Sequence, residues 1–349
     1  MENRRVLVVN THGIGDVIMT LPMLLLLKEI GFDLSMLVKS RVEGAAIEYL
    51  TKQYISHVNF LYVDDYRGRG LRGKLKFLHD IRASLPYVVL PTFSANKRLY
   101  NALAYLSGAK LRVGFGGALS FLNTNNIGNF IGQHKVEKNL SVVYQAFPEL
   151  TKNIEISKFH QLPEFLSKKG NSELITSDLS VPLICLAPGS GIVESHKRWP
   201  IELYKELAVQ LLHMGMRVAI IGGPGEESLG KFIAEGVSSP GNFQDMTGKL
   251  SIAGTLEFLH FSQCAVTNCN GISHMAAAVQ TPVVGLYGPT DPGLTGPYSQ
   301  RLRIVSRNLD CSPCYRRGYI QGCGNPVCMT EITVGEVLNN LKLILEECI

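Results

Sequence analysis

The sequence has no apolar run long enough to cross a membrane, no block of like charges and only a small excess of one charge sign. Its apolar stretch from Val17 to Leu27 lies between Asp16 and Lys28 and is shorter than the about 20 residues that a membrane span needs. We therefore interpret this stretch as a buried helix. The net charge of +5, spread along the chain, is too small to indicate nucleic acid, although it suits an anionic substrate. No targeting segment is recognisable, so we expect a cytoplasmic protein whose 8 cysteines stay reduced.

What the sequence does have is an alternation of strand-like and helix-like segments. With 349 residues, 46% of them hydrophobic, the chain is long enough for two domains that each bury a core. Short, nearly all-apolar runs predict parallel strands that are covered on both faces. In the first half we expect strands at 5–10, 34–38, 58–63, 87–91 and 111–115, and helices from about 16, at 73–84 and at 95–106. This rhythm predicts an α/β fold with right-handed crossovers.

The rhythm breaks between about Thr151 and Val181, where polar residues dominate, and we interpret this stretch as the interdomain linker region. It restarts with strands expected at 182–187, 217–221, 264–267 and 282–287 and a helix at 200–213. We place a first domain at 1–165 and a second at 166–349, with the last helix able to pack back on the first domain. Ligands of open α/β sheets bind at the carboxyl ends of the strands, so functional residues are expected in the loops that follow strands.

The loop after the first strand, Asn10 to Asp16, suggests a dinucleotide site but lacks its fingerprint. Ile18 stands where a Rossmann motif needs a third small residue, and the carboxylate of Asp16 would repel a pyrophosphate. Gly13 and Gly15 instead predict a tight turn that leaves Asp16 in the first turn of a helix, where it could deprotonate a hydroxyl. By spacing alone, a helix cap is the better explanation of Asp16.

Two loops of the second half have features that suit phosphate or nucleoside. The loop 187–191, which contains Ser190, could wrap oxygens with backbone N–H groups, and Lys197 lies just before an expected helix start. Glu226 follows another strand and could accept from a ribose or a base. The alternatives are a solvated surface lysine and a first-turn helix acid.

A third loop, 268–273, follows the same logic. It opens a helix near Gly271 whose free backbone N–H groups could hold a phosphate. His274 falls in the first turn of that helix and could donate to the same anion. A structural histidine is the alternative for His274.

Several separated motifs, in order over nearly the whole chain, resemble those of glycosyltransferase family 9, the ADP-heptose:lipopolysaccharide heptosyltransferases. The similarity is strongest from Leu186 to Pro292. The motifs are Gly15-Asp16-Val17 with Thr20-Leu21-Pro22, Lys197-Arg198-Trp199-Pro200, Gly271-Ile272-Ser273-His274-Met275-Ala276-Ala277-Ala278 and Tyr287-Gly288-Pro289-Thr290-Asp291-Pro292.

The resemblance implies a GT-B fold, in which two Rossmann-like domains with parallel sheets face a central cleft. The first domain would bind the acceptor and the second the nucleotide sugar. It also implies an inverting, metal-independent transfer of a heptose or related sugar from an ADP-sugar to a lipopolysaccharide core. Consistent with this, the sequence has no Asp-x-Asp motif of the metal-dependent type. Such a protein would work in the cytoplasm, with peripheral contact at the inner membrane surface left open. A different donor sugar, or a protein or polysaccharide acceptor, is the second hypothesis.

The resemblance also assigns roles to residues. It makes Asp16 the catalytic base on the acceptor side, with Gly13 and Gly15 in the same loop, and Lys197 the contact to the donor phosphates. On the donor side it adds Glu226 near the nucleoside, Leu250 over the adenine, and Gly271 and His274 in the phosphate-binding turn, with Ser190 helping to stabilise the departing diphosphate. The family usually has Asp-Ser-Gly or Asp-Thr-Gly where this chain has Cys269-Asn270-Gly271. The sequence therefore leaves the donor sugar open.

Four cysteines near the C-terminus form a separate pattern, Cys311-x2-Cys314-x8-Cys323-x4-Cys328, with prolines and glycines between them. The ligand count and loop composition are typical of a structural Zn or Fe knuckle, although the gaps are not those of a common zinc finger. Disulfides and unliganded thiols are the alternatives. A further hypothesis is a non-catalytic binding protein built on this knuckle, which the α/β architecture disfavours.

Overall fold

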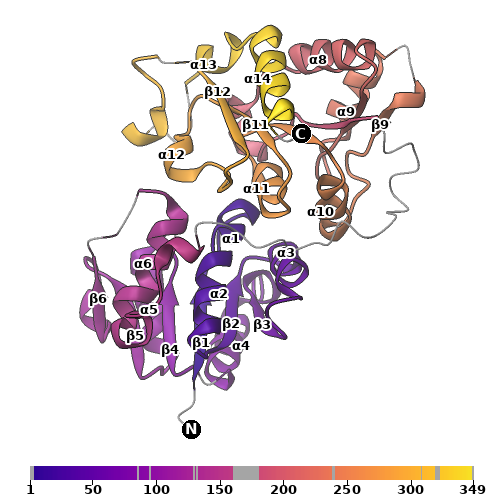
Figure 1. Ribbon diagram of the computed structural model, residues 1–349. Coiled ribbons are helices and arrows are strands. Elements are labelled where there is room, and N and C mark those ends of the chain that lie inside the picture. Colours follow the sequence, from indigo (N-terminus) through magenta and orange to yellow (C-terminus); the bar gives the residue numbers. More distant parts are fainter. Residues whose placement is uncertain are drawn as a thin grey trace. The chain divides into compact units, whose positions relative to one another are not determined.

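The computed structural model describes residues 4–84, 86–93, 96–128, 130, 133–159, 181–237, 240–307, 309–318 and 323–347. The chain divides into two compact units, Met1–Leu162 and Pro163–Ile349 (Figure 1). Each unit contains a six-stranded parallel sheet. The predicted α/β class with two Rossmann-like sheets is confirmed. The predicted linker region falls largely on residues 160–180, which lie outside the described residues.

The first unit is built on the strand order β3-β2-β1-β4-β5-β6. Its strands are β1 (Arg5–Val9), β2 (Asp33–Val38), β3 (Val58–Tyr62), β4 (Val88–Pro91), β5 (Leu111–Phe115) and β6 (Asn125–Ile127). Its helices are α1 (Ile14–Ile18), α2 (Leu21–Glu29), α3 (Arg41–Thr51), α4 (Gly70–Ala83), α5 (Lys97–Leu106), α6 (Lys135–Ala146) and α7 (Pro148–Thr151).

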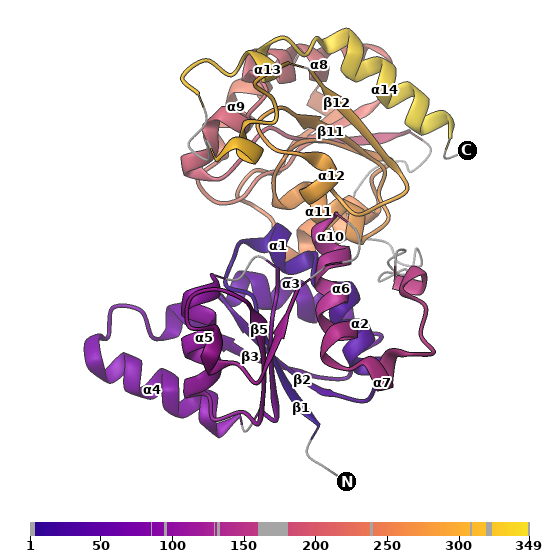
Figure 2. The same cartoon turned by 90° about the vertical axis from the view of Figure 1, so that its left-hand side faces the viewer.

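The central strand β1 is buried on both faces, as its apolar sequence predicts. Val6, Leu7 and Val8 have no exposed surface. Helices α4 and α5 cover one face of this sheet, and α2 and α6 cover the other (Figure 2). On the α4 and α5 side, Ile81 and Tyr100 pack in one core cluster with residues of β1, β2 and β4. Strand order reverses direction between β1 and β4, so the loops after these strands open a crevice at this edge.

The helix expected from about Asp16 is broken in two, which the sequence analysis did not anticipate. The first helix ends at Ile18, and α2 begins at Leu21 with Pro22 in its first turn. Proline has no N–H to donate to the preceding turn, so it fits a helix start but not a helix interior. The hydroxyl of Thr20 donates to the carbonyl of Val17 at 2.5 Å and closes the break.

The second unit repeats the design with the order β12-β11-β10-β7-β8-β9. Its strands are β7 (Leu183–Ala187), β8 (Arg217–Ile220), β9 (Phe243–Asp245), β10 (Cys264–Asn268), β11 (Val283–Tyr287) and β12 (Leu302–Ser306). Its helices are α8 (Ile201–His213), α9 (Glu227–Ala234), α10 (Ile252–His260), α11 (Gly271–Ala278), α12 (Pro292–Thr295), α13 (Val327–Thr330) and α14 (Val334–Glu346).

The last helix, α14, packs on its own unit, where Val337, Leu341 and Ile344 belong to the core together with residues of β10 and β11. The indole N–H of Trp199 donates to the carbonyl of Ile332 at 2.8 Å and ties the start of α8 to the segment before α14. None of the described helices combines the length and the hydropathy that a membrane span requires.

Candidate functional site

The loops after β7 and β10 lie side by side at the point where the second sheet reverses its strand order. The side-chain amide of Asn270 donates to the carbonyl of Gly189 at 2.9 Å, and that of Asn268 donates to the carbonyl of Pro188 at 2.8 Å. Two loops 80 residues apart in sequence are therefore held together. This is the position at which open α/β sheets bind ligands, and it gathers most of the predicted donor-side residues.

Lys197 stands in this site as a buried cation. Only 7% of the residue is exposed, so the alternative of a solvated surface lysine is wrong. Its ammonium lies 2.5 Å from a carboxylate oxygen of Glu194 and 4.9 Å from the centre of the Tyr315 ring. Burial by itself lowers the pKa of Lys197, but neighbouring Cys269, Glu194 and Tyr315 outweigh it, and the pKa is raised. A charged, desolvated ammonium at a strand-end crevice is suited to binding an anion.

Two residues that the sequence analysis missed complete this corner. Tyr315 comes from a short 3-10 turn, Cys314–Arg317, and its hydroxyl lies 2.9 Å from Nε2 of His196. Burial and the adjacent charge of Lys197 lower the pKa of His196, so its neutral form is favoured. The segment between the cysteines thus supplies an aromatic ring to the site, at a sequence separation that no local pattern reveals.

The side chains of the loop after β10 have different tasks. Asn270 caps α11, because its side-chain oxygen accepts from the N–H of Ser273 at 3.1 Å while its amide holds the neighbouring loop. Asn268 is fully buried, and its oxygen accepts from the N–H of Trp199 at 3.0 Å and the hydroxyl of Tyr204 at 3.2 Å. Cys269 is partly exposed. Its thiol interacts with Lys197 and with the Tyr287 hydroxyl.

Glu226 joins two loops of the second unit. Its carboxylate accepts from the N–H of Gly223 at 2.8 Å and lies against Gly189, where a side-chain carbon would approach it to 1.9 Å. A larger residue at position 189 would therefore displace the Glu226 carboxylate. Burial raises the pKa of Glu226, although the bond from Gly223 and the charge of Arg198 oppose the shift. Glu226 is the N-cap residue of α9. The acid in the first turn of this helix is the exposed Glu227, so the interpretation of Glu226 as a first-turn acid is wrong.

Ser190 and the remaining predicted residues lie in the loops and helix starts that follow strands of the second sheet. The Ser190 hydroxyl donates to the carbonyl of Glu194 at 2.9 Å and accepts from the guanidinium of Arg198 at 3.0 Å. Gly271 is the first residue of α11, and His274 is buried in that helix. Leu250 is half-buried in the turn before α10. Their roles toward a nucleotide stay predictions.

In the first unit Asp16 is the third residue of α1, whose N-cap is Gly13. Asp16 is therefore not the N-cap residue, although a carboxylate at this place still complements the helix macrodipole. Its carboxylate lies 2.7 Å from the ammonium of Lys135 at the start of α6, and each side chain is 24% exposed. The predicted position of Asp16 in the first turn of a helix is confirmed, although Gly13 has an ordinary φ of −72° and Gly15 is not among the glycines with positive φ. Lys135, 119 residues away in sequence, was not predicted.

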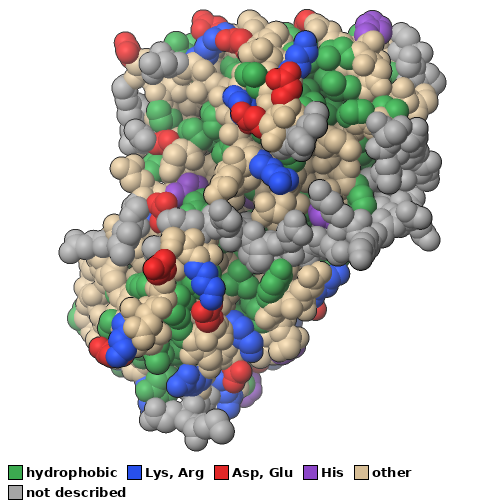
Figure 3. Space-filling model, in the orientation of Figure 1, with side chains coloured by type: hydrophobic (Ala, Val, Ile, Leu, Met, Phe, Trp, Pro, Cys, Tyr) green, Lys and Arg blue, Asp and Glu red, His purple; other side chains and the backbone are tan. Residues whose placement is uncertain are grey.

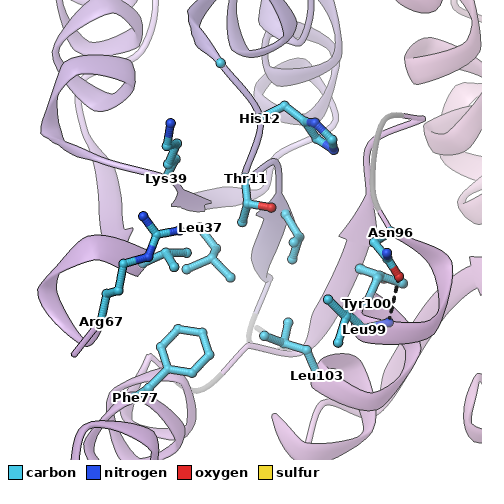
Figure 4. A pocket seen from close by; sticks show the side chains of 13 residues that line it. Thr11, His12, Leu37, Lys39, Arg67, Phe77, Asn96, Leu99, Tyr100 and Leu103 are labelled. Carbon is cyan, nitrogen blue, oxygen red and sulfur yellow. Dashed lines mark hydrogen bonds between the residues drawn. The ribbon is translucent and has the colours of Figure 1, made fainter. Parts of the chain in front are cut away.

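A cavity of about 600 Å³ lies at the carboxyl ends of β1 and β2, next to this loop (Figure 4). Thr11, His12 and Gly13 line it from the loop after β1. Lys39 and Arg67 lie together on one side of it, and Leu99 of α5 lies on the other (Figure 4). Its base is largely apolar and includes Phe77, Leu103 and Leu37. The cavity can therefore take a ligand that combines an anionic group with carbon-rich surface.

Comparison with known proteins decides the family. The model of glycosyltransferase family 9 (heptosyltransferase) matches residues 94–323. The chain belongs to this family. Lipopolysaccharide heptosyltransferase 2 of Salmonella typhimurium is 29% identical over 191 residues, which are 53% of this chain and 54% of the relative. Lipopolysaccharide heptosyltransferase 1 of Pseudomonas aeruginosa is 28% identical over 189 residues, 53% of this chain and 48% of the relative. The family 9 chain thus spans about half the length of the curated relatives it matches.

Solved structures support the fold of this family 9 member. The E. coli ADP-heptose lipopolysaccharide heptosyltransferase II superposes with a TM-score of 0.72 at 20% identity, over 98% of this chain and 99% of that one. A family 9 glycosyltransferase from Veillonella parvula reaches a TM-score of 0.76 at 17% identity, over 99% and 98% of the two chains. TibC of enterotoxigenic E. coli, an iron-containing dodecameric glycosyltransferase, reaches 0.60 at 15% identity, over 99% and 77%.

The four cysteines of the C-terminal pattern are free thiols in the described part of this family 9 chain: Cys311, Cys314, Cys323 and Cys328. Burial first, and then the neighbouring Cys314, Cys323 and Cys311, raise the pKa of Cys328 to about 11. Within the described residues, however, no three His, Cys, Asp or Glu side chains are close enough to hold a metal ion. The segment is anchored to the site, since the Ser312 hydroxyl donates to the carbonyl of Gly288 at 2.6 Å.

Proposed function

We propose that this chain is a glycosyltransferase that moves a sugar from a nucleotide-diphosphate donor, bound by the second unit, to a glycan acceptor bound by the first. Among family members an ADP-heptose donor and a lipopolysaccharide core acceptor are the first candidates, because the relatives it matches are named lipopolysaccharide heptosyltransferases. An E. coli heptosyltransferase of similar fold has been solved with ADP. The observation that carries the proposal is the buried cation of Lys197 at the strand-end crevice of the second sheet.

In the proposed reaction Asp16 accepts the proton of an acceptor hydroxyl as that oxygen attacks the anomeric carbon from the face opposite the nucleotide. The anomeric configuration inverts. Lys197, Ser190 and the N–H groups at the start of α11 would stabilise the charge that grows on the departing diphosphate, which makes a catalytic metal unnecessary. Lys135 would hold the Asp16 carboxylate in place through the 2.7 Å ion pair.

The cavity beside the Asp16 loop is the proposed acceptor site. Lys39 and Arg67 would pair with an anionic group of the acceptor, such as a carboxylate or phosphate on a core sugar, and the apolar base would contact the sugar ring. Such an acceptor is carried on a lipid, so the chain would meet it at a membrane surface while remaining a cytoplasmic protein.

Ligand-dependent unfolding tests the donor class. A ligand bound only to the folded state at about 100 times its Kd adds about 2.7 kcal/mol to the free energy of unfolding. We expect ADP and ADP-sugars to raise the unfolding temperature more than the GDP and UDP counterparts do. Transfer of radiolabelled heptose from ADP-heptose to a core acceptor then tests the reaction itself. Equal stabilisation by all three nucleotides would contradict the adenosine assignment.

Cys269 favours a second candidate, a transferase of the same fold with another donor sugar. A protonated thiol is a weak hydrogen-bond donor and cannot hold sugar hydroxyls as a carboxylate does. Asn268 is fully bonded inside the protein and Asn270 is engaged as a cap, so neither is positioned to replace the carboxylate.

We therefore expect Cys269→Asp to change the ranking of donors and to improve ADP-heptose relative to the sugar that the wild-type chain prefers. Initial rates on paired ADP-sugars, measured for both proteins, give the ranking directly. Cys264→Ser changes a buried cysteine in β10, the strand that leads into Cys269, and is the control for general effects on the fold. A ranking that does not move would defeat the altered-donor candidate and favour an ordinary heptosyltransferase.

A structural Zn or Fe ion at Cys311, Cys314, Cys323 and Cys328 stays a prediction. The four-cysteine pattern and the iron content of TibC favour it, whereas within the described residues no three such side chains are close enough to share an ion. Elemental analysis of protein purified without chelator tests it. We expect about one ion per chain, lost in Cys314→Ser. A metal-free wild-type chain that binds ADP normally would rule it out.

A further inference from the structure

Basic residues are concentrated around α4. The interpretation that the positive charge is spread evenly along the chain is therefore wrong for this segment. Residues 67–76 contain five Arg and Lys and no Asp or Glu. Together α4 and α5 carry six Arg and Lys against a single acid, Asp80, which accepts from the Tyr66 hydroxyl at 2.7 Å and lies 3.3 Å from the ammonium of Lys76. Figure 3 shows the opposite side of this unit, over α2, where basic and acidic side chains are interspersed.

The outer face of α4 is apolar at its centre. Phe77 and Ile81 face the sheet. Leu71 and Leu75, four residues apart, fall on the other side of the helix, where they are 71% and 59% exposed. The side chains of Arg72, Lys74, Lys76 and Arg82 surround them and are exposed as well. An exposed pair of leucines ringed by cations has no role in the packing of the unit.

The neighbouring helix α5 continues this surface. The guanidinium of Arg82 donates to the carbonyl of Leu106 at 2.9 Å, which fixes the two helices side by side (Figure 2). Leu99 and Leu106 on α5 are 69% and 45% exposed. The cavity of the first unit opens between the same helices, because Phe77 of α4 and Leu99 of α5 both line it.

We propose that the α4 and α5 surface docks the first unit on an anionic lipid bilayer, with Leu71 and Leu75 entering the headgroup region and the surrounding Arg and Lys pairing with lipid phosphates. Helices that lie in the bilayer interface have this combination of leucines and cations. Each cation near an anionic leaflet adds an electrostatic attraction that salt weakens. The evidence for lipid binding does not depend on the proposed function. Only the purpose of docking, which would bring the cavity to a lipid-borne acceptor, rests on that function.

Other occupants fit this surface less well. A second copy of the chain would bring the same cations against themselves, which costs free energy. Nucleic acid would satisfy the cations but would leave the leucines without a contact of comparable value, since bases stack on aromatic or guanidinium planes. An anionic bilayer offers phosphates to the cations and an apolar interior to the leucines, so it is the partner that fits both.

Flotation of the full chain with lipid vesicles tests the proposal. We expect binding to vesicles of phosphatidylcholine mixed with phosphatidylglycerol, weak binding to phosphatidylcholine alone, and a loss of binding at high salt. Leu71→Ser/Leu75→Ser and Arg72→Gln/Lys74→Gln should each lower the partition coefficient by about tenfold or more. The matched controls lie elsewhere in the same unit: Leu150→Ser and Lys28→Gln/Lys152→Gln change exposed side chains and should bind like wild type.

Wild-type binding by both α4 variants, or no binding of the wild-type chain to anionic vesicles, would overturn the proposal. A dimer in sedimentation equilibrium that Leu71→Ser/Leu75→Ser dissociates, without vesicle binding, would make the surface a self-association interface instead. ADP binding is measured on the same preparations. Loss of docking with ADP binding intact refutes only the lipid surface, whereas docking without nucleotide binding refutes the proposed function.

Discussion

Asp16→Asn is expected to lower turnover by about 10² or more while leaving donor affinity nearly unchanged. The amide keeps the shape of the carboxylate but cannot accept a proton, and the residues proposed to bind the donor lie in the other unit. Steady-state kcat with ADP-heptose, together with a direct titration of ADP, separates the two quantities. Wild-type turnover in this variant would remove Asp16 from the role of base.

Two further variants show whether the effect belongs to Asp16 itself. Glu29→Gln removes another ion-paired acid of the same unit, since Glu29 lies 2.6 Å from Lys158, and should leave kcat unchanged. Lys135→Met removes the partner of Asp16 but not the carboxylate. We expect a smaller loss of kcat than in Asp16→Asn, accompanied by an altered pH dependence, because the charge beside the carboxylate is gone. An unchanged pH profile would mean that Lys135 only packs there.

Lys197→Ala is expected to weaken ADP binding by about tenfold to a hundredfold and adenosine binding far less. A hydrogen bond to a charged group contributes about 1.5–3 kcal/mol, and only ADP offers phosphate oxygens to the ammonium. Calorimetric titration of both ligands with both proteins measures the difference. Equal weakening of ADP and adenosine would contradict a phosphate role.

The burial of Lys197 requires a control, because removing one partner of a buried ion pair also affects the fold. Lys197→Met keeps most of the side-chain volume and should weaken ADP binding in the same way. Lys231→Ala changes an exposed lysine of the same unit and should have no effect on either ligand. If Lys197→Met binds ADP normally, the loss in the alanine variant reflects packing rather than charge.

Much of the fold could be predicted because parallel strands are coded locally. Short apolar runs such as 183–187 and 264–268 are buried over their whole length, and the predicted strands are confirmed. The break between α1 and α2 could have been predicted as well, since Pro22 is a local signal. The strands β6, β9 and β12 were not expected, because short edge strands have weaker patterns that a single sequence does not distinguish from loops.

The sequence by itself determined the α/β class, the strand-end loops and the residue types in them, and hence the family and the chemistry that is proposed. These features depend on neighbours within a few residues. The ion pair of Asp16 with Lys135, the ring of Tyr315 over Lys197 and the internal bonds of Asn268 were decided only by the tertiary structure. Each joins segments at least 64 residues apart, and the sheet order that brings them together depends on the packing of the whole unit. The exposure of the α4 leucines was also decided by the tertiary structure, since only the packing of Phe77 and Ile81 on the sheet leaves Leu71 and Leu75 in solvent.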